Sequence, residues 1–418
     1  MRAPAPGWRR ARADQWSDGA AGEPIVRSIR RLIGGSVGQS IGRQAGRAAM
    51  RGVACSVAGL VACSVGCTGG APPTADQVGA LVFSDPSLSR PAGQACADCH
   101  APGAAFRDPE SDHSTSMGAV AGRFGERNAP TAMYARFAPP LHRDAAGGWV
   151  GGLFWDGRAS SLEAQAGLPL LQPLEMNNPD RARVVEAIRQ SSYAPLFREV
   201  FGPAALDDVD AAFGHVTEAL AAYERTPAFA PFSSRYDRYL AGQATLTASQ
   251  QRGLAIFEDP ARGNCASCHP SRPGPDGSPP LFTSFGYANL GIPRYRNSKF
   301  FAQPAAFNPD GDRRVDHGLM ATVGDPAQDG KFRVPTLRNV AHTAPYGHNG
   351  YFQNLQYMVD FLATRDVGSA DPEVGAWPPP EVPATVDRVH VGHLGLTPQD
   401  IDDLVAFLGT LTDEVRSR

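Results

Sequence analysis

Two short segments carry the side chains most able to do chemistry, and both have the pattern Cys-x-x-Cys-His. They are Cys96-Ala97-Asp98-Cys99-His100 and Cys265-Ala266-Ser267-Cys268-His269. Two thiols three positions apart lie on one side of a helical turn, where they can add to the two vinyl groups of a porphyrin. The adjacent His can then offer a ring nitrogen to the iron. The pattern predicts two covalently bound haems c, with Cys96, Cys99, Cys265 and Cys268 as attachment points and His100 and His269 as proximal iron ligands.

Zinc binding is the main alternative for paired cysteines. Zinc ribbons place their Cys-x-x-Cys pairs within about twenty residues of each other. Here a long stretch of chain separates the two pairs, and a His directly follows each of them. A disulfide within each pair would leave both histidines without a role. Two haem irons indicate electron transfer or chemistry on oxygen or peroxide.

The overall composition is that of a folded chain without a nucleic-acid partner. At 418 residues it can bury a sizeable core and is expected to form two domains. The formal net charge of -3 gives no indication of nucleic-acid binding. The 45 Gly and 37 Pro cluster between periodic segments, which predicts compact helices joined by long loops.

Apolar spacing typical of helices recurs along the chain, and strand signals are few. A short helix over 76–83 precedes the first haem motif, and one over 246–257 precedes the second. Further helices are predicted over 181–190, 193–201, 207–225, 354–364 and 398–411, with one more beginning at Ser161. The expected fold is mainly α, with two cytochrome c-like domains, each holding one covalently bound haem c, joined by long Gly/Pro-rich loops. The expected boundaries are 1–75 for a targeting segment and linker, 76–240 for the first domain and 241–418 for the second.

The three remaining cysteines, Cys55, Cys63 and Cys67, lie in the expected targeting segment. The apolar run 53–62 is too short to span a membrane as a stable helix. It ends in Leu60-Val61-Ala62-Cys63, which looks like a bacterial lipoprotein cleavage box. We therefore expect a lipid anchor at Cys63, with Cys67 as a second candidate.

Translation is expected to start at Met50, so that residues 1–49 would be an artefact of the gene model. A twin-arginine signal at Arg30-Arg31 is a weaker alternative because no adequate apolar stretch follows it. A short buried helix is another alternative for the apolar run. Export agrees with the haem motifs, since c-type haem is attached outside the cytoplasm, and predicts a periplasmic protein that meets the membrane only through its anchor.

Several ordered blocks resemble the bacterial di-haem cytochrome c peroxidases and their relative MauG. In the first half the blocks are Arg127-Asn128-Ala129-Pro130-Thr131, Phe154-Trp155-Asp156-Gly157-Arg158-Ala159, Leu162-Glu163-Ala164-Gln165-Ala166 and Pro173-Leu174-Glu175-Met176. In the second half they are Lys331 to Val340, Thr343-Ala344-Pro345-Tyr346 and His348-Asn349-Gly350. The resemblance covers about 76–412.

The resemblance implies that the first haem meets peroxide and that the second receives or stores electrons. Glu175 matches the family's distal carboxylate, which would move protons while the O–O bond breaks. A carboxylate in an apolar pocket has its pKa raised toward that task. Gln165 matches a residue that would orient peroxide or water. Trp155 matches the tryptophan between the two haems, where an indole can serve as an intermediate stop for an electron.

The resemblance also implies one calcium ion. Asn128, Thr343 and Pro345 match the family's calcium ligands, the last two through backbone carbonyls. Neutral oxygens supplemented by water suit calcium. Because these residues come from both halves, the ion would hold the interface between the domains.

The chain departs from the peroxidase pattern at both haems. The stretch Val120-Ala121-Gly122-Arg123 has no His where classical-type members place a second ligand of the first iron. His113 is the nearest candidate, but it lies several residues early. Without it, the first iron would be open to peroxide without reductive activation, as in MauG-like members.

At the second haem, Leu362 stands where the family has Met in peroxidases or Tyr in MauG, and Leu cannot bind iron. A thioether raises the haem potential and a phenolate lowers it. Met358 lies one helical turn before Leu362. The candidate distal ligands are Met358, His390, His393 and Met320, and an open or water-bound iron is a further alternative.

Two functions from different classes follow. The first is an exported di-haem peroxidase that reduces hydrogen peroxide to water with electrons from a small cytochrome c or cupredoxin. The second is a MauG-like oxidase that uses peroxide or oxygen to oxidise Tyr or Trp residues of a partner protein. An electron carrier without catalysis is a third option, against which Glu175 and Gln165 argue. Members of the family are often dimers, so a homodimer is a candidate oligomeric state.

Overall fold

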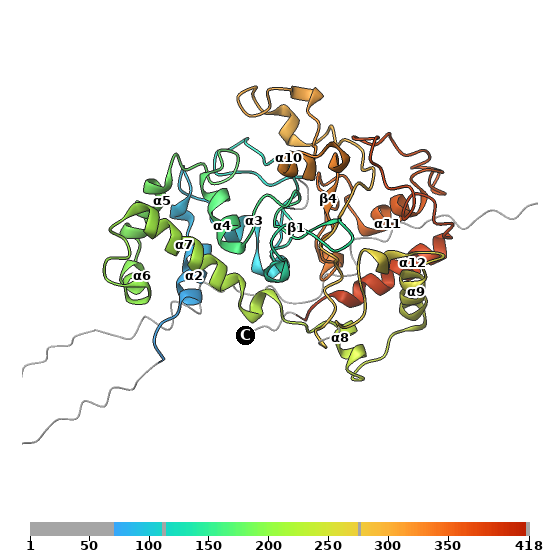
Figure 1. Ribbon diagram of the computed structural model, residues 1–418, viewed down its shortest axis with the longest axis horizontal. Helices are drawn as coiled ribbons and strands as arrows, with labels where there is room; N and C mark the ends of the chain where they lie inside the picture. Colours follow the sequence, from blue (N-terminus) through green and yellow to red (C-terminus); the bar gives the residue numbers. More distant parts are fainter. Residues whose placement is uncertain (1–70, 111–113, 275–276, 415–418) are drawn as a thin grey trace, which may run out of the picture. The chain divides into compact units, whose positions relative to one another are not determined.

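The computed structural model describes residues 71–110, 114–274 and 277–414, and α-helices are its longest elements (Figure 1). The first half contains α2 (Ala75–Phe83), α3 (Cys96–Cys99), α4 (Leu162–Leu171), α5 (Arg181–Gln190), α6 (Ala194–Phe201) and α7 (Val209–Glu224). The second half contains α8 (Arg235–Leu240), α9 (Ala248–Glu258), α10 (Leu319–Val323), α11 (Leu355–Thr364) and α12 (Pro398–Leu408).

The remaining regular structure consists of single turns of 3-10 helix and of very short strands. The 3-10 turns are η2 (Pro86–Leu88), η3 (Pro102–Ala104), η4 (Ala135–Phe137), η5 (Pro227–Phe229), η6 (Cys265–Ser267), η7 (Lys299–Ala302), η8 (Gly311–Arg313), η9 (Pro326–Gln328), η10 (Val340–His342) and η11 (Gly409–Leu411). The strands form two antiparallel pairs, β1 (His142–Arg143) with β2 (Trp149–Val150) and β3 (Tyr287–Ala288) with β4 (Phe332–Arg333). In the second pair, Tyr287 lies opposite Arg333. The prediction of a mainly α protein is confirmed.

The helices predicted from apolar spacing are confirmed to within about two residues, apart from the last one, which ends as the 3-10 turn η11. The predicted cap at Ser161 is also confirmed, because its hydroxyl accepts a hydrogen bond from Ala164 N at 3.2 Å. The sequence interpretation missed α8 and α10. A signal for α8 was present, since Ser234 and Asp237 form a capping box at its start.

A glycine in each half lets two helices cross at very short range. α2 meets α7 at Gly79, where a Cβ atom would lie 1.9 Å from Ala219 O. α9 meets α12 at Gly253, where a Cβ atom would lie 1.9 Å from Asp403 O. In both halves, therefore, the helix that precedes the Cys-x-x-Cys-His segment is pressed against the backbone of a late helix of the same half.

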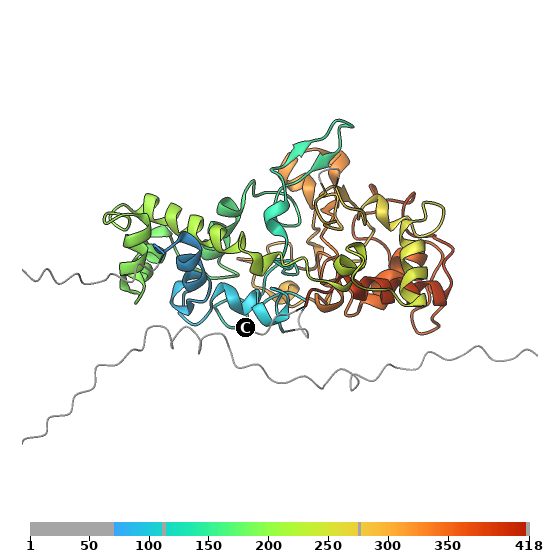
Figure 2. The same cartoon turned by 90° about the horizontal axis from the view of Figure 1, so that it is seen from below.

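Two large groups of buried apolar side chains and one small group, made of Leu153, Ala159, Leu162 and Ala221, form the core of the described region. The first extends from Val78 to Ala230 and joins residues of α2, α5, α6 and α7. The second extends from Tyr236 to Leu411 and joins residues of α9, α11 and α12. Figures 1 and 2 show these two sets of helices gathered on opposite sides of the described region.

Buried polar contacts join the two halves beneath these cores. Asp413, close to the end of the described chain, accepts hydrogen bonds from Tyr134 Oη at 2.7 Å and from Asn339 Nδ2 at 2.8 Å. Its second oxygen accepts from Ser233 N at 2.9 Å. One carboxylate thus holds three segments that lie far apart in the sequence.

Alanine substitutions at the crossing glycines test this packing. Gly79→Ala and Gly253→Ala should each lower the free energy of unfolding by about 1–3 kcal/mol, because the new methyl group would overlap a carbonyl oxygen. Urea denaturation of the purified protein measures the effect as a change in the transition midpoint.

Gly214, in the middle of α7, offers a control with the same chemical change. A Cβ atom there would meet no described atom within 4 Å. Gly214→Ala should therefore stabilise the helix by roughly 0.5–1 kcal/mol. The same sign of effect at all three glycines would contradict the close crossings.

Candidate haem and peroxide site

Both Cys-x-x-Cys-His segments fold as one tight turn. The first is α3 with His100 at its end, and the second is η6 followed by Cys268 and His269. His100 N donates to Cys96 O at 2.9 Å, and His269 N donates to Cys265 O at 2.9 Å. All four thiols are free rather than joined in disulfides. Each turn therefore presents two thiols and one imidazole together, as haem attachment requires.

Each of the two histidines uses one ring nitrogen for a hydrogen bond to a backbone carbonyl. His100 Nδ1 lies 3.0 Å from Phe106 O, and His269 Nδ1 lies 2.7 Å from Phe282 O. Because a carbonyl only accepts, Nδ1 must carry the proton, and Nε2 keeps a lone pair for a metal. Burial lowers the pKa of both rings, that of His269 to about 4. Both histidines are thus held neutral, which is the form that binds iron.

The two carbonyls come from residues with left-handed backbone. Phe106 has a φ of 51° and Phe282 a φ of 52°. A bulky residue seldom adopts this conformation, and strain of this kind gathers at functional sites. Sequence reasoning missed both residues, since nothing in the residue type Phe indicates a positive φ.

A cavity of about 230 Å³ adjoins the second motif. Its lining includes Cys265, Cys268 and His269, and most of the other lining residues are apolar. Such a lining suits the flat apolar face of a porphyrin. The attachment thiols, the oriented imidazole and the cavity fit a haem at this position.

The candidate distal ligands of the second haem divide into two groups. Met358 and His390 line the cavity, as does Leu362. His390 Nδ1 lies 2.9 Å from Asp387 Oδ2, and its side chain is 45% exposed. His393 is exposed, and neither His393 nor Met320 is among the lining residues.

At the first motif, Glu175 lies in the turn after α4. Its carbonyl accepts a hydrogen bond from Ala119 N at 2.8 Å, which fixes the turn. Within the described ranges, its carboxylate forms no hydrogen bond. Burial raises the pKa of the Glu175 carboxyl, and the Arg158 guanidinium opposes this rise.

Glu175 is close enough to the attachment cysteines for its charge to act on them. The pKa of Cys96 and of Cys99 is raised to about 12, mainly by burial, and the Glu175 carboxylate contributes to both shifts. Gln165 lies on α4, the preceding helix, and its half-buried side chain has no hydrogen-bond partner among the residues described. The structure therefore places the predicted carboxylate within electrostatic range of the attachment thiols of the first motif.

Glu224 is a second carboxyl near the first motif that the sequence interpretation did not identify. It is buried at the end of α7, and burial raises its pKa to about 8. Its charge acts on the Cys96 thiol more strongly than that of Glu175 does. The apolar helical spacing around position 224 gave no reason to expect a functional carboxyl there.

Trp155 contacts both halves of the chain. Its Nε1 donates to Asn128 O at 2.8 Å, and its carbonyl accepts from Arg333 N at 2.8 Å. The residue also lines the cavity beside the second motif. The predicted relay residue is thus in contact with the second haem cavity and is held by residues of both halves.

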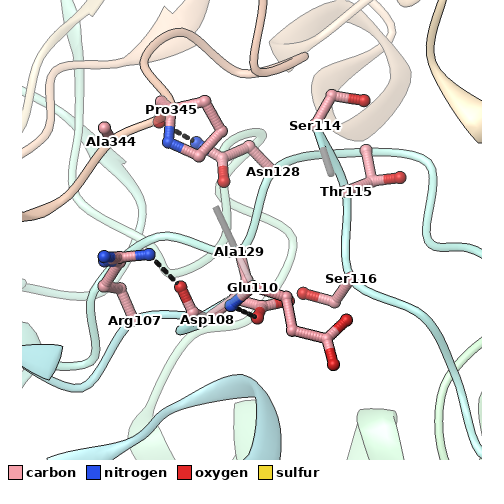
Figure 3. Close-up of a pocket in the computed structure, with 10 residues that line it drawn as sticks. All are labelled: Arg107, Asp108, Glu110, Ser114, Thr115, Ser116, Asn128, Ala129, Ala344 and Pro345. Carbon is pink, nitrogen blue, oxygen red and sulfur yellow. Dashed lines mark hydrogen bonds between the residues drawn. The ribbon is translucent and has the colours of Figure 1, made fainter. Parts of the chain in front are cut away.

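The predicted calcium ligands Asn128 and Pro345 are direct neighbours, as Figure 3 shows. Asn128 Nδ2 donates to Pro345 O at 2.7 Å. Both line a small pocket of about 10 Å³, which is room for one atom the size of a water molecule. Thr343, two residues before Pro345, is not among the lining residues of this pocket. A cation bound to Pro345 O would require the Asn128 amide to turn its oxygen toward it.

Some predicted features lie outside the described residues. These are the lipid-anchor candidates Cys63 and Cys67, the start at Met50, and His113 as a ligand of the first iron. Over the described ranges, no helix is both long and apolar enough to cross a membrane. No group of three or more His, Cys, Asp or Glu side chains there could hold a metal ion.

Comparison with known proteins identifies the family. The di-haem cytochrome c peroxidase family matches residues 73–245. The methylamine utilization protein MauG of Paracoccus denitrificans is 42% identical over 349 residues, which cover 80% of this chain and 88% of that protein. A cytochrome-c peroxidase of Denitromonas iodatirespirans is 30% identical over 360 residues, which cover 82% of each chain.

The crystal structure of the diheme peroxidase BthA from Burkholderia thailandensis E264 matches with a TM-score of 0.69 at 37% identity, covering 81% of this chain and 86% of that one. The chain therefore belongs to the di-haem cytochrome c peroxidase and MauG family. It is an oxidoreductase of the peroxidase type. Membership of a di-haem family agrees with the two haems c predicted from the motifs.

Removing one pair of attachment thiols should remove one haem. Cys96→Ala with Cys99→Ala should leave about half of the haem iron, and so should Cys265→Ala with Cys268→Ala. The haem content is measured by the absorbance of the alkaline pyridine complex and by intact mass. Full haem content in either double variant would contradict covalent attachment at that motif.

Proposed function

We propose that the chain is an exported di-haem peroxidase that reduces hydrogen peroxide to water with electrons from a small cytochrome c or cupredoxin. Each half, 76–240 and 241–418, forms a cytochrome c-like domain with one haem. The observation that carries the proposal is the unpaired Glu175 carboxyl beside the first haem motif, with its pKa raised by burial. Among the described residues this carboxylate accepts no hydrogen bond, and a role in proton transfer to peroxide would explain why a buried carboxyl stands there without one.

The haem iron held by His100 would supply a binding site for one peroxide oxygen and the redox chemistry at that oxygen. Glu175 would accept a proton from one peroxide oxygen and return a proton to the other, leaving oxygen. With two electrons and two protons from outside, one peroxide gives two molecules of water. Gln165, on the helix before Glu175, orients the peroxide by hydrogen bonding.

Trp155 serves as the intermediate stop for electrons that pass between the two haem sites. Its place in the cavity lining of the second motif and its hydrogen bond to Asn128 O support this role. The hydrogen bond fixes the plane of the indole, so the ring keeps one position relative to the cavity.

A calcium ion bound by Asn128, Thr343 and Pro345 would hold the two halves together at the same place. The support is that Asn128 and Pro345 meet across the halves and that neutral oxygens suit calcium. Trp155 donates a hydrogen bond to the backbone of Asn128, so the ion would also help to hold the indole in place.

Export follows from the haem chemistry and from the apolar run before Cys63. A lipid anchor at Cys63, or at Cys67, would tether the protein to a bacterial membrane facing the periplasm. Members of this family often pair, so a homodimer is the oligomeric state to test.

A MauG-like oxidation of a partner protein is the second candidate function. Two observations favour it, namely the 42% identity to a MauG and Leu362 in the cavity where peroxidases of the family have Met. In that reaction, peroxide would take its two electrons from Tyr or Trp side chains of the partner instead of from a small redox protein.

Glu175→Gln tests the peroxidase mechanism. The variant should keep both haem spectra and lose on the order of 10²-fold or more in the peroxide step, because an amide is too weak a base to accept the proton that a carboxylate accepts. Glu163→Gln is the matched control, since Glu163 lies on α4 and pairs with Arg225 at 2.6 Å. Stopped-flow absorbance after mixing with peroxide measures the step, and unchanged turnover in Glu175→Gln would exclude this residue from the mechanism.

The pH dependence should follow the same carboxyl. Glu175 must be ionised to accept a proton, so the peroxide step should fall as the pH drops through the pKa of this group. Burial raises that pKa, so the acid limb should lie above the ordinary pKa of a Glu side chain. The limb should disappear in Glu175→Gln.

Low-temperature EPR of the fully oxidised protein separates the two candidate functions. One high-spin and one low-spin haem, with both signals lost on stoichiometric peroxide, would indicate the MauG-like reaction. Two low-spin haems, with reactivity only after one-electron reduction, would indicate a conventional peroxidase with a further ligand such as His113.

Calcium removal tests the interface site. A chelator should lower the thermal midpoint, and calcium at one hundred times its dissociation constant should restore about 2.7 kcal/mol. Asn128→Ala should lose this response. A midpoint that is the same with and without the chelator would contradict the calcium site.

A further inference from the structure

The acidic side chains in the lining of the second haem cavity already have arginine partners. Asp316 accepts hydrogen bonds from Arg127 Nε at 2.6 Å and from Arg127 Nη2 at 2.7 Å. Glu381 accepts from Arg294 Nε at 2.9 Å. Both carboxylates line the cavity. Because each is already paired with an arginine, neither neutralises a further positive charge in the cavity.

Arg333 lines the same cavity and, among the described residues, has no carboxylate partner. Its Nε donates to Phe154 O at 3.2 Å, and within the described chain it forms no ion pair with a carboxylate. Burial lowers its pKa, an effect that the nearby Tyr287 opposes. An enclosed guanidinium without a counter-charge is unfavourable, so its presence in the lining indicates an anion that the protein itself does not supply.

His348 is a second group without a partner in this lining. Only 4% of the residue is exposed, and neither ring nitrogen has a hydrogen-bond partner in the part of the chain that the structure describes. The ring stacks on Phe332 at 3.6 Å between centroids, which fixes its plane. The nearest carboxylate oxygen is Glu381 Oε2, which lies 4.0 Å from His348 Nε2. The Glu381 carboxylate already accepts a hydrogen bond from Arg294.

We propose that Arg333, with His348 as a second donor, binds the carboxylate side chains of the haem attached at Cys265 and Cys268. The proposal rests on the proposed haem at this motif. A haem c carries two carboxylates on one edge, and a guanidinium is the side chain best suited to bind such a group. The same porphyrin would then be held by thioether bonds, by His269 and by a cation at its polar edge.

Arg333 is also a positioning residue for the relay tryptophan. Its backbone N donates to Trp155 O at 2.8 Å, and its Nε donates to the carbonyl of the preceding residue, Phe154. Both residues therefore depend on Arg333 through hydrogen bonds. The Arg333 side chain would thus bind the haem edge and also bond to the residue before Trp155, while its backbone N bonds to Trp155 itself.

The charge of Arg333 should act on the reduction potential of the second haem. A positive charge at the haem edge stabilises the reduced iron relative to the oxidised iron, because the oxidised form carries one more positive charge. Removing the charge should lower the midpoint potential of this haem. The first haem, which lies at the other motif, should keep its potential.

Spectroelectrochemical titration of the full chain with both haems attached tests the proposal. The variants are Arg333→Gln, Arg333→Lys, His348→Ala and the control Arg272→Gln, whose side chain is 81% exposed in the same half. Arg333→Gln should lower the potential of the second haem alone, and Arg333→Lys should restore most of the shift. His348→Ala should give a smaller decrease, and Arg272→Gln should match the unmodified protein.

A second-haem potential in Arg333→Gln that equals that of the control would overturn the proposal. If Arg333→Gln does not retain both haems, Arg333→Lys decides. Retained haem with nearly unchanged potential supports charge binding, whereas loss of haem in this variant too would assign Arg333 a packing role and overturn it. The potentials do not depend on peroxide turnover, so failure of the peroxidase function would be recognised separately by its kinetics.

Discussion

The hydrogen bond from each predicted haem-binding histidine to a backbone carbonyl is the interaction on which the proposed haem sites depend. His100 and His269 can bind iron only if Nδ1 holds the proton and Nε2 is free, and the carbonyls of Phe106 and Phe282 impose that state. To present these carbonyls, both phenylalanines adopt a left-handed backbone. The glycine crossings at Gly79 and Gly253 complete the framework that keeps each turn in place, because the helix before each motif cannot shift against its neighbour.

The chemistry proposed for this chain requires electron transfer between two haem sites. Contacts between the two halves hold Trp155, the proposed intermediate, between them. Trp155 is bonded to Asn128 on one side and to Arg333 on the other. Arg127, one residue before Asn128, bonds to Asp156 beside the tryptophan at 2.7 Å and to Asp316 of the second half. Trp155 therefore lies where hydrogen bonds and ion pairs from both halves meet, which favours a constant distance for the electron transfer proposed here.

Sequence reasoning predicted the helix positions and the family, because these depend on local apolar spacing and on ordered blocks of residues, whereas the role of Glu175 stays a prediction. It could not predict the carbonyl partners of the histidines, since a positive φ at Phe is set by packing and not by residue type. It also missed Glu224 and the unpaired Arg333, because burial and the lack of a partner are properties of the folded chain. The structure separates the four candidate distal ligands by position, since Met358 and His390 line the cavity whereas His393 and Met320 do not.

The carboxylate of Asp413 also bears on how the protein is made. Tyr134 of the first half donates to a residue 279 positions later, so this bond cannot form until nearly the whole chain has been synthesised. The segment around Tyr134 therefore gains this bond only after α12 and the turn that follows it have been synthesised. The first Cys-x-x-Cys-His segment is therefore synthesised long before the Tyr134–Asp413 bond can form in its half. Enzymes that attach haem would meet this segment in a chain that has not finished folding. Closure by Asp413 would come last, as the step that completes assembly.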